Sequence, residues 1–262
     1  MPAASLDDQL EALDVELLAT IPSQTTEFDR RSLLALHVAA RRVYGRFGWL
    51  EIGSHLGGSL QALVRDPACT RIDSIDPRPD AQDDQRGERY AYPQNSTRRM
   101  LDNLAALPGA DVTKLHTHDA TTAQLDPAQL PAPAVCLIDG EHTDRSAAQD
   151  AAFCRRVVRD DGLIVFHDTG IVYRAVRRFV DAVRGEGTVS VQLAYLPDSL
   201  FCVELGSPRL LEDPAVVRQR LEAHWGVLWL LHSNDRFRAA LGGRVARALR
   251  RGGVLKVPDE PS

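Results

Sequence analysis

The chain has 262 residues, of which 44% are hydrophobic and 26% charged, proportions ordinary for a globular protein with one large α/β domain or one domain plus appendages. Its formal net charge of −5 gives no general attraction to phosphate backbones, so nucleic acid is not an expected partner. No stretch is apolar enough to span a membrane, the N-terminus lacks the apolar core of a signal peptide, and the four cysteines form no C-x-x-C pair, so we expect a cytoplasmic protein with free thiols and no membrane partner.

Two helices are predicted before the first core strand. Residues 6–20 space their leucines as an amphipathic helix does, residues 22–26 interrupt the pattern, and residues 29–46 resume it. We expect residues 1–47 to form a helical cap. Such a cap either covers a ligand cleft or packs against a partner, and the sequence does not decide between these roles.

A Gly-rich bend follows the first predicted strand. Residues 49–52, which are apolar apart from Glu51, run into a bend over residues 53–59, and a helix is predicted from Leu60. A strand, a tight turn and a helix N-terminus on a parallel sheet commonly hold a nucleotide-like ligand. The bend is not a dinucleotide fingerprint, which would need glycine at His55, and no Gly-Lys-Ser/Thr phosphate loop follows.

The pattern E-x-G-x-x-x-G-x-S over residues 51–59 resembles the first motif of class I S-adenosylmethionine (SAM) methyltransferases. This resemblance implies that the bend lies against the methionine part of SAM, with contacts from Glu51, Gly53, Ser54, Gly57 and Ser59. The second predicted strand, residues 71–77, contains an acid 23 residues after Gly53, Asp76. An acid at that distance in a β-α-β unit is placed to accept hydrogen bonds from two ribose hydroxyls.

Residues 77–98 form a long polar segment between sheet elements, which is more typical of a functional loop than of a plain connection. We expect a lid-like insertion. Its Tyr90 and Tyr92 either stack on a substrate or anchor the loop to the body of the protein.

A strand is predicted over residues 114–120, after a helix that begins near Met100. The end of this strand, Asp119-Ala120, resembles the fourth motif of the same methyltransferases. The resemblance implies that Asp119 accepts a hydrogen bond from the adenine amino group and that Ala120 also contacts SAM.

Acids and histidines follow two neighbouring buried strands. Residues 134–138 are continuously apolar, as in a central parallel strand, and Asp139 and His142 come directly after them. A helix is predicted next, and a second buried strand over residues 163–166 ends in His167-Asp168. Because adjacent parallel strands lie about 5 Å apart, the carboxylates at their tips can share one cation.

This arrangement resembles metal-dependent sugar O-methyltransferases of the macrolide-sugar and mycobacterial methylated-polysaccharide type. The resemblance implies that Asp139 and Asp168 are metal ligands and that His142 is the general base. His167 stands where those enzymes carry an acid, so it either leaves its coordination position to water or favours Mn²⁺ over Mg²⁺. A histidine suits removal of a hydroxyl proton near neutral pH, although His142 could instead be a helix-capping or core residue.

The predicted fold is a doubly wound, Rossmann-like α/β methyltransferase sheet, mostly parallel with a C-terminal antiparallel strand, plus N- and C-terminal helices. After a helix over residues 173–183, the antiparallel strands predicted at 189–193 and 200–205 resemble the last two strands of that sheet. The SAM-binding core would span 48–205 and a helical extension 206–262. This extension contains an apolar patch suited to a dimer interface, a substrate cap or packing against the sheet.

The resemblance implies a SAM-dependent O-methyltransferase that uses SAM and a divalent cation, Mg²⁺ or Mn²⁺, and acts as a homodimer on a saccharide or a glycosylated small molecule. Two other classes compete with this interpretation. A metal-dependent hydrolase built on the Asp/His cluster would leave Gly53, Gly57 and Asp76 without a role. A non-catalytic SAM-binding module would leave the Asp/His cluster unexplained.

Overall fold

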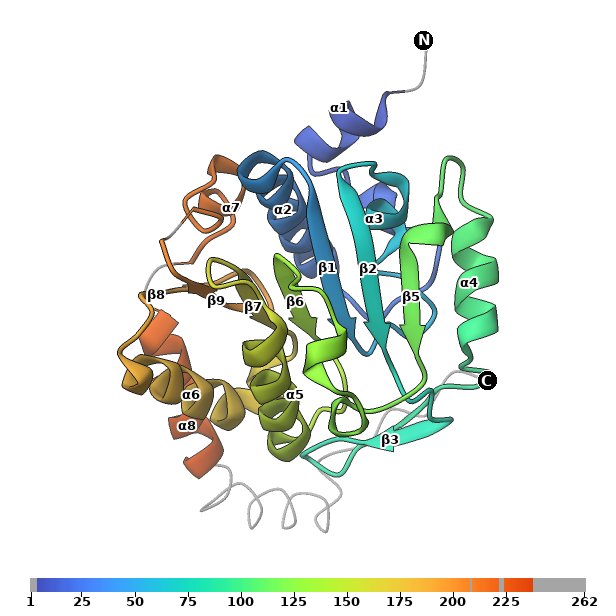
Figure 1. Cartoon of the computed structure of the whole chain (residues 1–262). Coiled ribbons are helices and arrows are strands. Elements are labelled where there is room, and N and C mark those ends of the chain that lie inside the picture. The colour runs from blue at the N-terminus through green and yellow to red at the C-terminus, as the bar shows by residue number, and fades with distance from the viewer. Residues whose placement is uncertain (1–3, 208, 222–223, 238–262) are drawn as a thin grey trace, which may run out of the picture. The chain divides into compact units, whose positions relative to one another are not determined.

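A seven-stranded sheet organises the chain in the computed structural model, which describes residues 4–207, 209–221 and 224–237. The strand order is β5-β2-β1-β6-β7-β9-β8 (Figure 1). The strands are β1 Phe47–Ile52, β2 Cys69–Ile75, β5 Leu115–His118, β6 Val135–Ile138, β7 Leu163–Phe166, β8 Val191–Tyr195 and β9 Phe201–Leu205. The first five of these are parallel to one another, and β9 runs antiparallel to both β7 and β8. The predicted doubly wound sheet, mostly parallel with an antiparallel C-terminal strand, is confirmed.

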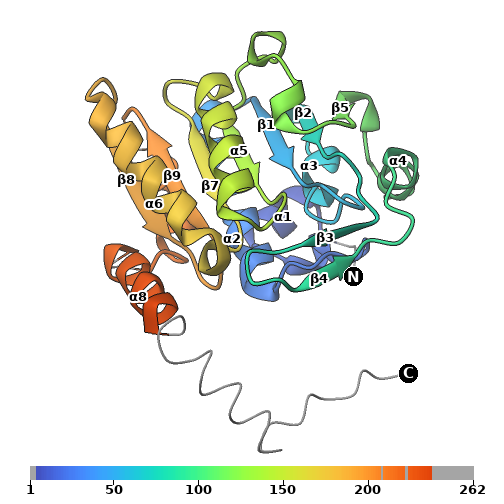
Figure 2. The ribbon, with the colours of Figure 1, turned by 90° about the horizontal axis from the view of Figure 1, so that it is seen from below.

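Helices cover both faces of this sheet. α2 (Glu27–Tyr44) packs on β1 and α3 (Gln61–Arg65) on β2, whereas α5 (Asp144–Val157) and α6 (Thr169–Glu186) pack side by side over β6, β7 and β9 (Figures 1 and 2). On the α6 side, the rings of Phe166 and Phe179 meet edge to face with centroids 5.5 Å apart. α4 (Thr97–Ala105) follows β2 and buries Met100 and Leu104. Strands covered on both faces need continuous apolar runs, which is the pattern that β6 and β7 carry.

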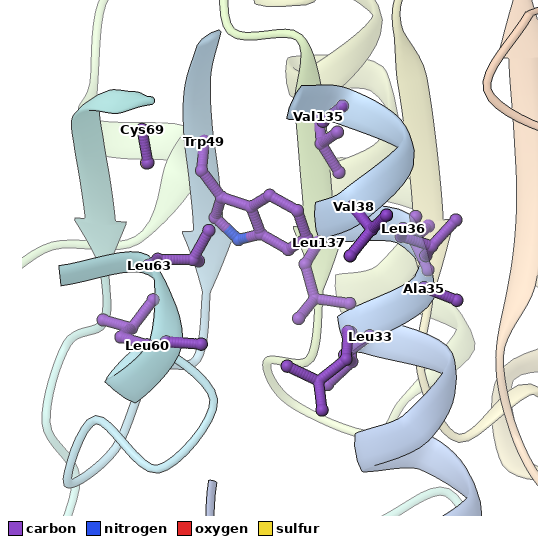
Figure 3. Close-up of a cluster of buried hydrophobic side chains, with 14 of the residues drawn as sticks. Leu33, Ala35, Leu36, Val38, Trp49, Leu60, Leu63, Cys69, Val135 and Leu137 are labelled. Atoms are coloured by element: carbon purple, nitrogen blue, oxygen red, sulfur yellow. The ribbon is translucent and has the colours of Figure 1, made fainter. Parts of the chain in front are cut away.

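The N-terminal helices belong to the same hydrophobic core as the sheet. Figure 3 shows the Trp49 indole of β1 between Leu60 and Leu63 on one side and Leu33 and Val38 of α2 on the other. All five side chains are at least 95% buried. Since burying a side chain of this size contributes roughly 1.5–3 kcal/mol, the apolar face of α2 is a large part of what holds it on the sheet.

The first predicted helix is broken in the structure, and the C-terminal extension contains more than one helix. Residues 6–20 form α1 (Leu6–Glu11) and a short 3-10 helix (Val15–Leu18) rather than one helix. The break lies at Leu13, whose φ of 52° is left-handed, and this turn lets leucines of both pieces reach the core. Within the helical extension predicted over residues 206–262, the described residues contain two separate helices, α7 (Pro214–Val217) and α8 (His224–Phe237), and residues 238–262 lie outside the described residues.

The polar segment after β2 contains a small antiparallel hairpin, β3 (Ala81–Asp83) and β4 (Arg89–Ala91). Its crowded charges build the turn. The buried Asp84 carboxylate accepts hydrogen bonds from the backbone N–H groups of Arg86 at 2.7 Å and Glu88 at 3.0 Å. Figure 1 shows the hairpin beyond the arrowheads of β1, β2 and β5, and Figure 2 looks onto this side of the molecule. The insertion therefore lies at the carboxyl edge of the sheet.

The chain divides into two compact units, Met1–His224 and Trp225–Ser262. All the strands and every site residue discussed below belong to the first unit. Of the helices in the described residues, none combines the length and the apolar character needed to cross a bilayer.

Candidate active site

A cleft of about 980 Å³, partly open to solvent, lies where the strand order reverses between β1 and β6. In open α/β sheets this switch point is the usual place for a ligand. Most of the site residues predicted from sequence line it together, namely Gly53, Ser54, Ser59, Asp76, Ala120, Asp139, His142, His167 and Asp168. The cleft therefore brings the Gly-rich bend and the Asp/His cluster into one space.

Three of the predicted contact residues lie outside the lining of this cleft. Glu51 is 1% exposed, accepts a hydrogen bond from the Ser59 hydroxyl, and has its pKa raised by burial to about 8. Gly57 faces α4, because a Cβ there would lie 2.9 Å from Leu104 Cδ1. The Asp119 side chain is 61% exposed and accepts a hydrogen bond from Thr97. Glu51 and Gly57 thus support the wall behind the cleft.

Gly53 makes possible the close approach of the two central strand tips. Its φ is +88°, and a Cβ at this position would lie 2.0 Å from the carbonyl oxygen of Asp139. Only glycine tolerates both the left-handed backbone and this contact. The first glycine of the bend is therefore required by the packing of β1 against the end of β6, in addition to any contact with a ligand.

Asp76 is held by the backbone on both sides of the cleft. Its Oδ2 accepts from the His55 N–H at 2.9 Å and its Oδ1 from the Arg78 N–H at 2.8 Å. The Arg78 guanidinium folds back to donate to the His55 carbonyl and to the Ser54 hydroxyl. His55 and Arg78 both adopt positive φ, 44° and 55°. This clamp fixes the bend relative to the β2 tip, and Arg78 was not singled out from sequence.

The Asp/His cluster is compact. Among the described residues, Asp139, His142, His167 and Asp168 each offer one ligand atom within 4.8 Å of the others. His142 Nε2 lies 3.1 Å from Asp168 Oδ2 and 3.5 Å from Asp139 Oδ1. His167 Nδ1 lies 2.9 Å from Asp139 Oδ1 and 3.2 Å from Asp168 Oδ2. Each imidazole therefore faces both carboxylates.

The electrostatics of this cluster favour positive charge. Burial alone would raise the pKa of Asp139, but the charges and hydrogen bonds of His167 and His142 lower it to about 2. Burial likewise opposes protonation of the two histidines, yet the carboxylates raise the pKa of His142 and raise that of His167 well above its ordinary value. A divalent cation among the same atoms would supply the charge that protons supply otherwise. A site that combines carboxylate oxygens with an imidazole nitrogen suits Mn²⁺ or a similar ion better than Mg²⁺.

The β3–β4 hairpin is fastened to the loop that carries His142. The Gln85 N–H donates to the His142 carbonyl at 2.7 Å, and Gln85 Oε1 accepts from the Asp144 N–H at 2.9 Å. Tyr92 lines the cleft and meets the His55 ring edge to face, with centroids 5.1 Å apart. Tyr90 lies edge to face with the His142 ring at 6.4 Å. Both tyrosines thus anchor the hairpin across the cleft.

Asp150 of α5 is a cleft residue that the sequence analysis missed. It is 5% exposed and accepts a hydrogen bond from the Thr122 hydroxyl at 2.6 Å. Burial raises its pKa to about 6. The available signal was a lone acid on the apolar face of a predicted helix, beside Ala147, Ala151 and Cys154. A buried acid with a perturbed pKa in a cleft is a candidate for ligand contact.

Replacing Asp150 with asparagine should change the pH dependence of stability. The raised pKa means that stability conferred by the protonated acid is complete below pH 3.8 and is lost as the pH rises through about 6. The Asp150→Asn variant should match the wild type near pH 4 and exceed it by about 3 kcal/mol near pH 8. Denaturant unfolding across this pH range measures the difference. A difference that is constant with pH would show that Asp150 does not titrate in this way.

Comparison with known proteins gives a match to one family model and many solved structures of similar fold. Residues 50–169 match a family described as "Methyltransferase domain". The structure of the O-methyltransferase NovP has a TM-score of 0.58 at 14% identity, covering 78% of this chain and 100% of that chain. MycE methyltransferase from the mycinamycin biosynthetic pathway, in complex with Mg, SAH and Mycinamycin VI, has a TM-score of 0.51 at 16% identity, covering 78% of this chain and 56% of that chain. No curated protein sequence matches the chain. At these identities the solved structures show a shared fold.

Proposed function

We propose that the chain, whose residues 50–169 match a family described as "Methyltransferase domain", is a SAM-dependent O-methyltransferase. Its acceptor would be a hydroxyl of a saccharide or a glycosylated small molecule, and a divalent cation would assist the reaction. The observation that carries this proposal is that one cleft joins Gly53 and Asp76 to Asp139, His142 and Asp168. A donor site and a proton-accepting site therefore share one space.

On the donor side, Asp76 is the residue that would bind the ribose. Its two oxygens are fixed by backbone N–H groups at 2.8 and 2.9 Å. Oδ2 also lies 3.2 Å from Arg78 Nη1, whereas Oδ1 retains a lone pair for a hydroxyl donor. Gly53 leaves the floor of the cleft without a side chain, so the methionine part of SAM can approach the backbone.

On the acceptor side, His142 in its neutral form would take the proton of the attacking hydroxyl. The hydroxyl oxygen forms a bond to the methyl carbon, the carbon–sulfur bond of SAM breaks with its electron pair going to sulfur, and the proton moves to Nε2 of His142. Asp139 and Asp168 would hold the cation, with His167 as its nitrogen ligand. The cation, when bound, would lower the pKa of the acceptor hydroxyl and fix its approach.

Three observations support this proposal over the alternatives. The methyltransferase-domain match favours a transferase over a hydrolase. The Gly-rich bend and the Asp/His cluster line one cleft, which places a donor site and an acceptor site next to each other. The structural neighbour MycE was solved with Mg, SAH and Mycinamycin VI, which motivates the glycosylated acceptor. The homodimer and the cytoplasmic location stay predictions.

Chelation should stop methyl transfer without preventing SAM binding. Because the proposed cation contacts the acceptor and not the donor, EDTA should abolish transfer of a labelled methyl group to saccharide acceptors, and Mn²⁺ should restore it more fully than Mg²⁺. Calorimetry with SAM in the presence of EDTA should give an unchanged affinity. Unchanged turnover in EDTA would remove the cation from the proposal, and absence of SAM binding would favour the hydrolase.

A further inference from the structure

Asp29, in the first turn of α2, lies beside the Asp/His cluster. It faces the edge of the His167 ring opposite to the edge that faces Asp139 and Asp168. It is 1% exposed, and its Oδ2 lies 3.4 Å from His167 Nε2. The other ring nitrogen of His167 faces Asp139 and Asp168. The imidazole is therefore held between an acid on α2 and two acids at the strand tips.

Asp29 is itself rigidly held. Its Oδ2 accepts from the Thr26 N–H and hydroxyl at 3.3 and 3.0 Å, which is the capping box of α2. Its Oδ1 accepts from the Ser199 N–H and hydroxyl at 3.3 and 3.0 Å. Ser199 in turn accepts from the Thr169 hydroxyl at 2.7 Å, at the start of α6. The Asp29 carboxylate thus joins the start of α2 to the loop before β9. This loop is hydrogen-bonded in turn to the start of α6, just beyond His167.

His167 Nε2 has little else to interact with. It is buried, and none of the described residues makes a hydrogen bond of good geometry to it. The Asp29 carboxylate at 3.4 Å is an acidic group that faces it. Histidines that ligate metals usually present one ring nitrogen to the ion and the other to a carboxylate or carbonyl, which fixes the orientation of the ring. The arrangement of Asp29, His167 and the two strand-tip acids has this form.

We propose that Asp29 is a positioning residue, which holds the His167 ring so that Nδ1 is presented to a cation bound by Asp139 and Asp168. This inference rests on the proposed function, since it concerns the cation assigned there. It explains why a buried acid of the N-terminal helix reaches the far side of a strand-tip histidine, which helix capping alone does not require. Asp8 shows the difference, because it forms the same capping box with Ser5 at the start of α1 and does so at the surface.

The test is Mn²⁺ binding by calorimetry to the full chain with S-adenosylhomocysteine present. Asp29→Asn should weaken Mn²⁺ binding by about 10- to 100-fold, the usual effect of losing such a supporting group. Two variants control for loss of structural hydrogen bonds. Asp8→Asn removes the equivalent capping acid of α1, and Ser199→Ala removes a hydroxyl donor to Asp29 without touching His167. Both controls should bind Mn²⁺ within about twofold of the wild type.

Each outcome separates the inference from the proposed function. If Asp29→Asn binds S-adenosylhomocysteine normally but also binds Mn²⁺ like the wild type, the positioning role is overturned and the proposed function stands. If the wild type binds S-adenosylhomocysteine but no Mn²⁺, both the positioning role and the cation are overturned, while the methyl donor stands. If all three variants weaken Mn²⁺ binding equally, Asp29 acts through fold stability alone and the inference fails.

Discussion

Replacing His142 with alanine is expected to lower methyl-transfer turnover by about 10²- to 10⁴-fold, the usual contribution of a general base. The reason is positional. His142 Nε2 lies within 3.5 Å of both Asp139 Oδ1 and Asp168 Oδ2, in the cleft that the acceptor hydroxyl would enter. Its side chain is far from the Gly-rich bend in sequence and is not needed to form the donor half of the cleft. Turnover should therefore fall while the affinity for S-adenosylhomocysteine, measured by calorimetry, stays within about twofold.

A second histidine provides the matched control for this substitution. His118 ends β5 and lies 3.2 Å from Asp73 Oδ1, outside the lining of the cleft. His118→Ala removes an imidazole of similar exposure that also contacts a carboxylate, and its turnover should remain close to that of the wild type. Near-normal turnover of His142→Ala, or an equal loss in both variants, would remove the base assignment.

Replacing Gly53 with alanine is expected to cost about 2–5 kcal/mol of folding free energy and to abolish SAM binding. The strain of a left-handed residue with a Cβ contributes about 1–2 kcal/mol, and forced overpacking contributes about 1–3 kcal/mol. The added Cβ would lie 2.0 Å from the Asp139 carbonyl oxygen, so the tips of β1 and β6 would have to separate. Denaturant unfolding and calorimetry with SAM measure the two effects.

Gly109→Ala separates the backbone strain from the steric clash. Gly109 also has a positive φ, +75°, but among the described residues, its chain neighbours aside, none has an atom within 4 Å of the position its Cβ would occupy. This control should lose only the strain, about 1–2 kcal/mol, and should bind SAM normally. If the two variants lose the same free energy and both bind SAM, close approach of the strand tips is not what Gly53 provides.

The sheet and the residues at its carboxyl edge could be predicted because local patterns determine them. The apolar runs 134–138 and 163–166 are buried strands, and a parallel strand places whatever follows its last apolar residue at a known edge. For this reason the amino-acid sequence alone predicts that Asp139 and Asp168 lie near each other. The same reasoning predicts the place of Asp76, which lies at the end of the second strand, 23 residues after Gly53.

The contacts between distant segments could not be predicted in this way. Asp29 reads in the sequence as the capping acid of a helix, and nothing near it indicates a contact with a residue 138 positions later. The Arg78 side chain folds back onto the Gly-rich bend from a backbone with positive φ. Tertiary contacts impose this conformation on a non-glycine residue, and intrinsic backbone propensity does not predict it. The Asp119 side chain is 61% exposed and lies outside the lining of the cleft, and strand periodicity does not specify on which side of the strand end it lies.

The hydrogen bonds of Gln85 link the opening of the cleft to the position of His142. Because the hairpin N–H holds the carbonyl of His142 itself, swinging the hairpin aside to admit an acceptor would also loosen the loop that bears the base. We therefore expect methyl transfer only while the hairpin is closed over the cleft. Closure would shield the sulfonium donor from water during turnover. The rate of product release, and with it the turnover rate, would then depend on how often two hydrogen bonds of Gln85 break. These are the bond from its N–H to the His142 carbonyl and the bond to its Oε1 from the Asp144 N–H.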